Sequence, residues 1–400
     1  MAEGRLMPER FRVRVMNQIA AAGLARLPGE RYVTGADLEA PDALLVRSAD
    51  LHTVAIPPTV RAVARAGAGT NNIPVPALSA RGIPVFNAPG ANANAVKELV
   101  LAGMLMAARN LAPALAFVAA LDPGAADLEQ QVEDGKKAFA GTELAGQTLG
   151  IVGLGKVGCL VADAAIRLGM QVLGFDPEIT VDAAWSLPAQ VRRATSVEEV
   201  LRSGNFISLH VPLVEATRGL VGAHNVGALR HGAVLLNFSR DGVVDNAALL
   251  AALDGDALGG YVCDFPAAAI LRHPRVVALP HLGASTREAE ENCAVMVADQ
   301  LRDFLENGNI VHAVNFPQVS QPRESDFRVA IANANVPNML GQISTAMARA
   351  GLNIHTMVNK SRGEMAYTLV DVDSAVPQNV LVELQGIAGV LSVRYLPRAG

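Results

Sequence analysis

The chain has 400 residues, of which 51% are hydrophobic and 18% charged, and its formal net charge at pH 7 is -5. This length suits two or three domains, and the apolar composition excludes an intrinsically disordered chain. Acidic residues outnumber basic residues by 38 to 33, and the few lysines form no cluster beyond one adjacent pair, so we expect no nucleic-acid partner.

The cysteines and the start of the chain bear on its location. Cys159, Cys263 and Cys293 are odd in number and far apart, which favours neither a disulfide framework nor a zinc site. Residues 3–14 are charged rather than apolar, and the longest uncharged apolar run, 99–108, is half of a membrane span. We therefore expect a cytoplasmic protein with no membrane partner and no metal.

The first part of the chain alternates between short strands and helices, which is typical of a parallel α/β unit. The sequence predicts strands at 44–47 and 85–87, and helices around 57–66 and 75–81.

A long apolar helix is expected from 92 to 110, with Asn92 or Asn94 as its N-cap and Pro113 closing the pattern. A helix that is apolar all round is usually buried, so this one is also a candidate dimer interface. Residues 122–148 are polar and rich in glycine, and they predict a surface segment.

The segment from 148 to 280 alternates strictly between apolar strands and helices. This pattern predicts a doubly wound parallel sheet with helices on both faces. The expected strands are 148–153, 171–176, 205–210, 233–239, 259–264 and 276–280, and the expected helices are 156–168, 196–202, 224–230 and 245–253.

The segment 287–306 predicts a helix long enough to leave this domain and return to the first one. We therefore expect a Rossmann domain at 93–286 inserted in a flavodoxin-like substrate-binding domain made of 1–92 and 287–317. After a linker, the order strand, helix, strand, strand, helix, strand indicates a third, ferredoxin-like domain at 318–400.

The first strand of the long sheet ends in a glycine-rich turn. The motif Gly-Leu-Gly-Lys-Val-Gly at 153–158 follows a strand and begins a helix, and Asp176 ends the next strand. Together they predict a dinucleotide site, with pyrophosphate at the helix N-terminus and Asp176 on the ribose diol. The alternative is an ordinary tight turn with a surface aspartate. Asp176 and Glu178 place negative charge where NADP carries its 2′-phosphate, which favours NAD.

Polar side chains follow other strands of this sheet, at the edge where open α/β sheets bind ligands. They are His210 with Pro212, the run Ser239-Arg240-Asp241-Gly242, Asp264 and His281. Each is also explained as a turn former, a helix cap or a solvated loop residue. An arginine and a histidine at one crevice are nevertheless what oxidation of a 2-hydroxy acid requires. The arginine binds the carboxylate, and the histidine takes the hydroxyl proton.

Several segments carry a resemblance to a known family that covers nearly the whole chain. They resemble the D-isomer-specific 2-hydroxyacid dehydrogenases, and among them the members that oxidise 3-phospho-D-glycerate to 3-phosphooxypyruvate with NAD, the first step of L-serine biosynthesis. The C-terminal segment resembles an ACT regulatory domain. The other matching segments are 65–75, 82–101, 153–158, 235–245 and 279–296.

The resemblance implies a role for individual residues. Arg240 would orient the substrate carboxylate, and His281 would be the acid and base. The cofactor NAD would lie against Gly153, Gly155, Lys156, Val157, Gly158, Asp176, His210, Pro212, Phe238, Ser239, Asp264 and Gly283.

The substrate would bind in the first domain, where an arginine at a strand end and backbone amides suit a carboxylate and a phosphate. Arg61 and Arg65 either join this site or lie on the solvated face of a helix. The expected substrate residues are Arg47, Ser48, Gly67, Ala68, Gly69 and Asn87.

The chain departs from the family at one position. Five residues after Asp264 the family has a glutamate that hydrogen-bonds the catalytic histidine, and this chain has Ala269. The sequence does not place Glu288, Glu290 and Glu291, which lie on the next helix. We therefore expect a slower dehydrogenase or one with a shifted pH optimum. The alternatives are a hydroxypyruvate or glyoxylate reductase of the same family and a low-turnover, NAD-sensing binding protein.

Regulation and assembly follow from the resemblance too. L-Serine would bind Asn333, Asn335 and Asn353 at a dimer interface, and the protein would be a homodimer or homotetramer. The purely structural alternative is that Asn335 caps a helix that starts near Pro337 and that Asn353 forms a turn. Many such domains have glycine where this chain has Asn338.

Overall fold

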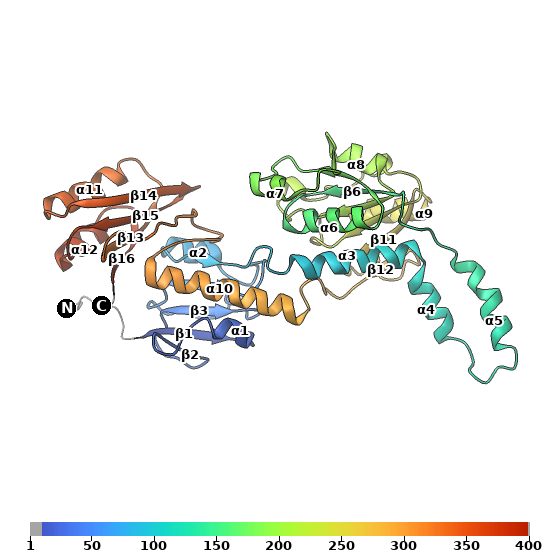
Figure 1. Cartoon of the computed structure of the whole chain (residues 1–400), viewed down its shortest axis with the longest axis horizontal. Helices are drawn as coiled ribbons and strands as arrows, with labels where there is room; N and C mark the ends of the chain where they lie inside the picture. The colour runs from blue at the N-terminus through green and yellow to red at the C-terminus, as the bar shows by residue number, and fades with distance from the viewer. Residues whose placement is uncertain (1–9, 399–400) are drawn as a thin grey trace. The chain divides into compact units, whose positions relative to one another are not determined.

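The computed structural model describes residues 10–398. Two compact units make up the chain: Met1–Asn92 with Arg287–Gly400, termed the split unit, and Ala93–Thr286, termed the inserted unit. Figure 1 follows their elements from blue at the N-terminus to red at the C-terminus. Residues 1–9 and 399–400, which include part of the charged start of the chain, lie outside the described residues.

The split unit begins with a five-stranded parallel sheet in the order β2-β1-β3-β4-β5, the flavodoxin order. Because helices cover both faces, β3 is buried along its whole length. The strands are β1 Phe11–Met16, β2 Tyr32–Gly35, β3 Ala43–Val46, β4 Ala62–Arg65 and β5 Val85–Phe86, and the helices are α1 Ala21–Leu24, α2 Val75–Ala80 and α10 Arg287–Asn307.

The predicted helix around 57–66 is wrong, whereas the helix at 75–81 is confirmed as α2. A turn at Pro57 and Pro58 leads instead into β4, whose Ala62, Val63 and Ala64 are fully buried. Alanine favours helices, but burial between two parallel neighbours outweighs that local preference.

The inserted unit is a seven-stranded parallel sheet in the order β12-β11-β10-β9-β6-β7-β8, so the predicted doubly wound sheet is confirmed. The seventh strand, β8, escaped prediction because it consists of two exposed arginines. The strands are β6 Thr148–Val152, β7 Gln171–Phe175, β8 Arg192–Arg193, β9 Phe206–Leu209, β10 Ala233–Asn237, β11 Leu258–Cys263 and β12 Val276–Ala278.

The predicted helices 156–168, 196–202 and 245–253 are confirmed, whereas 224–230 contains only the short 3-10 helix η3 Val226–Ala228 and α7, Val181–Ser186, was not predicted. The confirmed helices are α6 Lys156–Arg167, α8 Val197–Ser203 and α9 Asn246–Asp254.

The apolar helix α3, Ala93–Ala108, is confirmed, and it packs against α6, β10 and β11. Pro113 does not end the helical region, because it lies in the first turn of α4, Leu111–Ala119, where a missing N–H costs little. The expected surface segment 122–148 contains helices that were not predicted, α5 Leu128–Gly135 and η1 Lys136–Phe139.

Across residues 10–398, no single helix is long and apolar enough to span a membrane. The pair α3 and α4 reaches the required length and composition only together, and the two are bent by 70°. Val100 and Met104 of α3 are fully buried, as in a core helix.

The last part of the split unit has the predicted order of strands and helices, with an antiparallel sheet in the order β14-β15-β13-β16. One face of this sheet forms a core with its own helices. On the other face, Ala330, Leu369 and Leu396 share a core with Phe304 of α10. The elements are β13 Phe327–Ala334, α11 Met339–Arg349, β14 Ile354–Arg362, β15 Met365–Val372, α12 Gln378–Gln385 and β16 Val390–Pro397.

Arginines from beyond α10 cap its C-terminus. The backbone carbonyl oxygens of its last four residues, 304–307, accept hydrogen bonds from Arg394, Arg323 and Arg328. Cations are favourable at this end of a helix, where four carbonyls have no partner within the helix. The linker 317–325 and the C-terminal sheet therefore supply the hydrogen-bond donors for the C-terminal end of α10, a helix that begins at the boundary of the inserted unit.

The three cysteines are free and buried, and burial raises the pKa of each thiol. Within the described part of the chain, no group of three or more His, Cys, Asp or Glu side chains is placed to hold a metal ion.

Candidate functional site

Close backbone approaches shape the glycine-rich turn between β6 and α6. Gly153 has a φ of +94°, and a Cβ there would lie 2.6 Å from the carbonyl oxygen of His210. At Gly158 a Cβ would lie 2.1 Å from the Gly153 carbonyl oxygen, whereas Gly155 has open space at that point. The fold thus requires glycine at 153 and 158, and Gly155 leaves room for a ligand at the N-terminus of α6.

Asp176 follows β7 and ties this strand to the glycine-rich turn. Its Oδ2 accepts a hydrogen bond from the Leu154 backbone N–H at 2.8 Å, and its Oδ1 accepts one from Glu178 at 2.9 Å. Each oxygen has a second lone pair, which suits the hydroxyl donors of a ribose diol. Lys156 and Val157 begin α6, with Lys156 exposed and Val157 half-buried.

His210 follows β9 and forms a wall of the same turn. Its backbone N–H donates to Val152 at 2.8 Å, and its Nε2 lies 2.9 Å from the Ser208 hydroxyl. Burial lowers the pKa of His210 to about 4, so its imidazole is neutral at pH 7. Pro212 is exposed two residues further on. His210 therefore fits a structural wall better than a proton carrier.

Asn237, at the end of β10, organises the loop that carries Arg240. Its side chain is 1% exposed. Its Oδ1 accepts from the Ser239 hydroxyl at 2.8 Å, and its Nδ2 donates to the Arg240 carbonyl at 3.0 Å and to the Tyr261 hydroxyl at 3.2 Å. Sequence reasoning missed this residue, and its only signal was a polar amide at the end of an apolar strand.

Arg240 itself is exposed, and its Nη1 donates to the Ser239 carbonyl at 2.6 Å. Within residues 10–398 it forms no ion pair, so its guanidinium is available to an anion. Phe238 points the other way, into the core, where a Cβ on Gly103 of α3 would lie 2.8 Å from its ring. The predicted contribution of Phe238 to a cofactor wall is thus limited to its backbone.

Asp264 follows β11 and holds the segment 281–283, termed the histidine loop. The carboxylate is 1% exposed, and its two oxygens accept the backbone N–H groups of Leu282 and Gly283, each at 2.7 Å. The Asp264 backbone N–H donates to the Asn237 carbonyl at 3.2 Å. The loop that carries Arg240 and the histidine loop are therefore fixed through the ends of two adjacent strands, β10 and β11.

His281 is exposed and has a φ of +58°, a conformation that the bonds of Asp264 to the next two residues help to maintain. Its ring lies 4.8 Å from that of Phe265, centroid to centroid, with 51° between the planes. No other residue of the described chain forms a hydrogen bond or ion pair with this imidazole. Ala269 is exposed and offers no polar group. Phe265, which sequence reasoning also missed, is thus the side chain that orients His281.

In the split unit, Arg47 follows β3 and forms an ion pair with Glu290 of α10, with 2.5 Å between Nη2 and Oε1. The two side chains are 36% and 38% exposed. This contact places Glu290, which the sequence left open, and it offsets the positive charge of Arg47. Ser48 is exposed beside Arg47 in the chain. Arg61 pairs instead with Asp42 at 3.6 Å.

The other predicted substrate residues lie together at the ends of β4 and β5. The Asn87 amide donates to the Ala68 carbonyl at 2.6 Å, which joins Asn87 to the loop 67–69. Gly67 and Gly69 are half-buried. Because all five strands are parallel, these ends share one edge of the sheet with Arg47.

The three predicted effector residues do not lie together within one chain. Asn333 and Asn335 lie at the end of β13. Asn353 precedes β14, whose first residue pairs with Val372, the β15 partner of the first residue of β13. Asn353 is therefore at the other end of the sheet, about 20 Å away at 3.4 Å per residue. A site that uses all three needs more than one copy of the chain.

The geometry of the inserted unit fits a dinucleotide. The glycine-rich turn and the loops of Arg240 and His281 follow β6, β10 and β12, so they share the carboxyl end of one parallel sheet. The open space at Gly155 and the free lone pairs of Asp176 suit a pyrophosphate and a ribose.

Comparison with known proteins agrees with this geometry. Residues 101–283 match the family "D-isomer specific 2-hydroxyacid dehydrogenase, NAD binding domain". The chain is 33% identical to D-3-phosphoglycerate dehydrogenase of Haemophilus influenzae, over 82% of this chain and 79% of that protein. It is 31% identical to the protein of the same name in Escherichia coli K12, with the same coverage.

A solved structure matches as well. The NAD+-bound 3-phosphoglycerate dehydrogenase of Entamoeba histolytica superimposes with a TM-score of 0.59 at 25% identity, over 76% of this chain and 98% of that one. The inserted unit is an NAD-binding domain, and NAD is the cofactor.

Proposed function

Because this chain belongs to the D-isomer-specific 2-hydroxyacid dehydrogenase family, we propose that it oxidises 3-phospho-D-glycerate to 3-phosphooxypyruvate. One observation carries the proposal. The exposed side chains of Arg240 and His281 stand on two loops that the buried Asn237 and Asp264 fix to neighbouring strand ends. The relatives named D-3-phosphoglycerate dehydrogenase support the choice of substrate.

Oxidation of a 2-hydroxy acid removes a hydride from C2 and a proton from the hydroxyl group. NAD, when bound, accepts the hydride. His281 takes the hydroxyl proton in its neutral form, and Arg240 holds the carboxylate through two parallel N–H donors. Phe265 and Asp264 act only through His281, by fixing the ring and the loop on which it stands.

The phosphate group of the substrate binds at Arg47, Ser48 and the backbone amides of 67–69 and 87. To bind there it displaces Glu290 from Arg47. The same ion pair favours a second candidate, a hydroxypyruvate or glyoxylate reductase, because a neutralised Arg47 attracts a phosphate less strongly. The exposed Ala269 favours a third candidate, an NAD-binding protein with little turnover.

We also propose a function for each part of the split unit. Residues 1–92 and 287–317 bind substrate, and 318–400 form an ACT domain that binds L-serine between copies in a cytoplasmic homodimer or homotetramer. Asn333 supports this proposal, because its buried Oδ1 has no partner. Exposed Leu105, Leu115 and Val118 on α3 and α4 favour assembly. Titration of L-serine and sedimentation of the purified protein test both parts.

The substrate assignment is tested by NADH oxidation with 3-phosphooxypyruvate, hydroxypyruvate and glyoxylate. We expect the phosphorylated acid to be preferred, and Arg47→Ala to lower kcat/KM for it by about 100-fold while changing the other two little. Arg349→Ala, an exposed arginine on α11, is the control and leaves all three rates unchanged.

Glu290→Gln separates the candidates further. If a phosphate competes with Glu290, this variant lowers KM for 3-phosphooxypyruvate alone. If neither Arg47→Ala nor Glu290→Gln changes the rate with any of the three acids, the reductase is favoured. If the protein binds NADH normally but transfers no hydride to any of the acids, the NAD-binding protein is favoured.

A further inference from the structure

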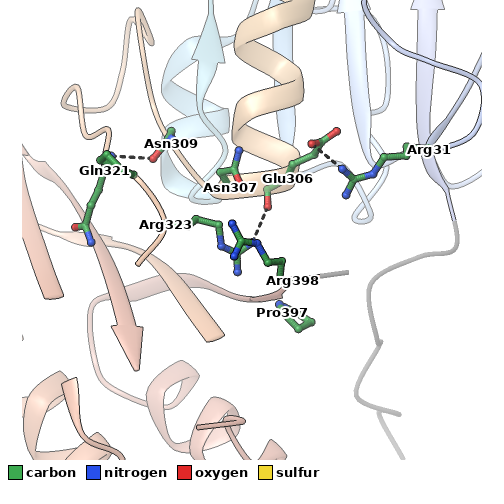
Figure 2. A pocket seen from close by; sticks show the side chains of 9 residues that line it. Arg31, Glu306, Asn307, Asn309, Gln321, Arg323, Pro397 and Arg398 are labelled. Atoms are coloured by element: carbon green, nitrogen blue, oxygen red, sulfur yellow. Dashed lines mark hydrogen bonds and ion pairs between the residues drawn. The ribbon is translucent and has the colours of Figure 1, made fainter. Parts of the chain in front are cut away.

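A cavity of about 460 Å³ lies in the split unit, lined by none of the residues of the candidate functional site (Figure 2). We term it the arginine cavity. Its lining comes from separate segments, with Arg31 before β2, Glu306 at the end of α10, Arg323 in the linker and Arg398 after β16. The volume is in the range of small-molecule sites.

The charged side chains of the cavity do not balance. The lining carries three arginines and one glutamate, and Arg323 is the arginine that has no carboxylate partner in the described chain. Glu306 is already engaged, because its two oxygens accept from Arg31 at 2.9 Å and from the Tyr32 hydroxyl at 2.7 Å. Arg398 is exposed and pairs with Asp326 at 3.2 Å, an acid that does not line the cavity. The cavity therefore has a positive surface.

Arg323 contributes most to this imbalance because it is half-buried and has only neutral partners. Its Nη atoms donate to backbone carbonyls of Glu306, Asp326 and Leu396, and its buried Nε has no partner. Burial lowers the pKa of its guanidinium, and the positive charge of Arg328 lowers it further. In the described chain it forms no ion pair. A buried charge without a counter-charge is costly, and an anion beside it removes that cost.

The wall behind these arginines is rigid. Arg328 and Asp371 are both 0% exposed and form a bidentate pair at 2.6 and 2.8 Å. The other N–H groups of Arg328 donate to the carbonyls of Asn307, Gln321 and Pro322. All five guanidinium donors are thus used, which fixes the linker and leaves no donor of Arg328 for a ligand.

The cavity is distinct from the substrate residues of the same unit. Arg31 precedes β2 and Arg47 follows β3. Because the strands are parallel, Arg31 lies at the amino ends of the strands and Arg47 at their carboxyl ends. Glu290, the partner of Arg47, is in the first turn of α10, and Glu306 is in its last turn, about 24 Å along the helix at 1.5 Å per residue.

We propose that the arginine cavity binds a small metabolite through an oxyanion, a phosphate or a carboxylate group, held by Arg31, Arg323 and Arg398. The bound anion neutralises the lining and joins the end of α10 to the linker and to β16. Its role is that of an effector rather than a substrate, because it lies at the opposite end of the strands from Arg47. This proposal does not depend on the reaction proposed above.

The test is isothermal titration of the full chain with inorganic phosphate and, separately, with citrate, at constant ionic strength. The variant Arg31→Gln/Arg398→Gln removes two lining charges and leaves Arg323 to cap α10. The control Arg167→Gln/Arg349→Gln makes the same charge change at two residues that are 77% and 75% exposed.

We expect saturable binding to wild type and to the control, and at least about tenfold weaker binding to the cavity variant. The probe that binds more tightly assigns the anion as phosphate or carboxylate. Binding should also raise the Tm of wild type and control but not of the cavity variant. Equal binding to all three proteins would place the anion elsewhere and overturn the proposal, as would the absence of saturable binding with both probes.

Discussion

The histidine loop and the linker are each held by one buried aspartate, but the two carboxylates are neutralised differently. Asp264 accepts two backbone N–H groups and, within the described residues, has no cationic partner. Asp371 accepts one backbone N–H, from Glu324, together with both arms of Arg328. Both carboxylates are essentially inaccessible to solvent.

This difference distinguishes the histidine loop, which carries a proposed catalytic residue, from the linker, which has a structural role. The backbone bonds of Asp264 fix the loop and leave His281 exposed, with the negative charge of the carboxylate still uncompensated nearby. The ion pair of Asp371 cancels that charge and closes the linker against the sheet. The arrangement at Asp264 leaves a reactive side chain exposed next to it. The ion pair of Asp371 stabilises the fold but leaves no exposed group that could react.

The largest effect is expected from Arg328→Met, which leaves Asp371 buried without its cation. We expect the free energy of unfolding to fall by about 3–5 kcal/mol. Urea unfolding followed by circular dichroism measures it. The double variant Arg328→Met/Asp371→Leu should recover most of the loss, and a single variant as stable as wild type would break the comparison.

A smaller loss of stability, with a clear loss of activity, is expected from Asp264→Asn. The amide keeps one acceptor, so one backbone N–H of the histidine loop loses its partner at a cost of about 1–3 kcal/mol. Because the loop then shifts His281, kcat should fall by about 10- to 100-fold. Asp163→Asn, at an exposed acid of α6, is the control. Unchanged kcat would show that Asp264 does not position His281.

Phe265→Leu should have a milder effect, because it removes only a ring contact. Aromatic pairs contribute about 0.5–1.5 kcal/mol, so we expect kcat/KM to fall by about 3- to 10-fold with little change in Tm. The loss should lie in kcat rather than in KM, since the ring faces His281 directly. Phe139→Leu, in the separate ring pair with Phe117, controls for the loss of an aromatic side chain. A kcat equal to that of wild type would contradict a positioning role.

The smallest effect is on the pH dependence of the free energy of unfolding, where Asp371 contributes only at acid pH. Burial alone would raise the pKa of Asp371, but the hydrogen bonds of Arg328 and Glu324 outweigh it and lower the pKa below its ordinary value. The stabilisation is therefore complete above the unfolded pKa of about 3.9 and is lost as the pH falls through the lowered value. The double variant Arg328→Met/Asp371→Leu should lack this acid-dependent step in unfolding, and its persistence would assign the step to another group.

Much of the inserted unit could be predicted from the sequence because its strands are continuous apolar runs between glycine-rich turns. The misses have local causes. β4 is rich in alanine and reads as a helix until its burial is known, and β8 is too short and too polar to be recognised. The helix α5 is short and largely polar, and Leu128 and Val132 alone are too few apolar residues to indicate a helix.

The sequence predicts only those parts of the candidate site that form a local pattern in the chain. A glycine-rich turn between a strand and a helix is visible in the sequence, and so are polar residues at strand ends. Contacts between distant residues are not visible. Arg47 and Glu290 are 243 positions apart, and no local pattern connects them. Asn237 and Phe265 act through the residues that they hold, so neither has a motif of its own.

The core that the first sheet shares with α10 and β16 has a consequence for the order in which the protein folds. The inserted unit is one continuous stretch, so its contacts can form as soon as it has been synthesised. The first sheet is synthesised before it but shares its core with α10 and with Leu396 of the last strand. The first sheet is thus synthesised before the inserted unit but completed after it, and its apolar face stays uncovered until α10 and β16 have been made, which is when aggregation or a chaperone competes with folding.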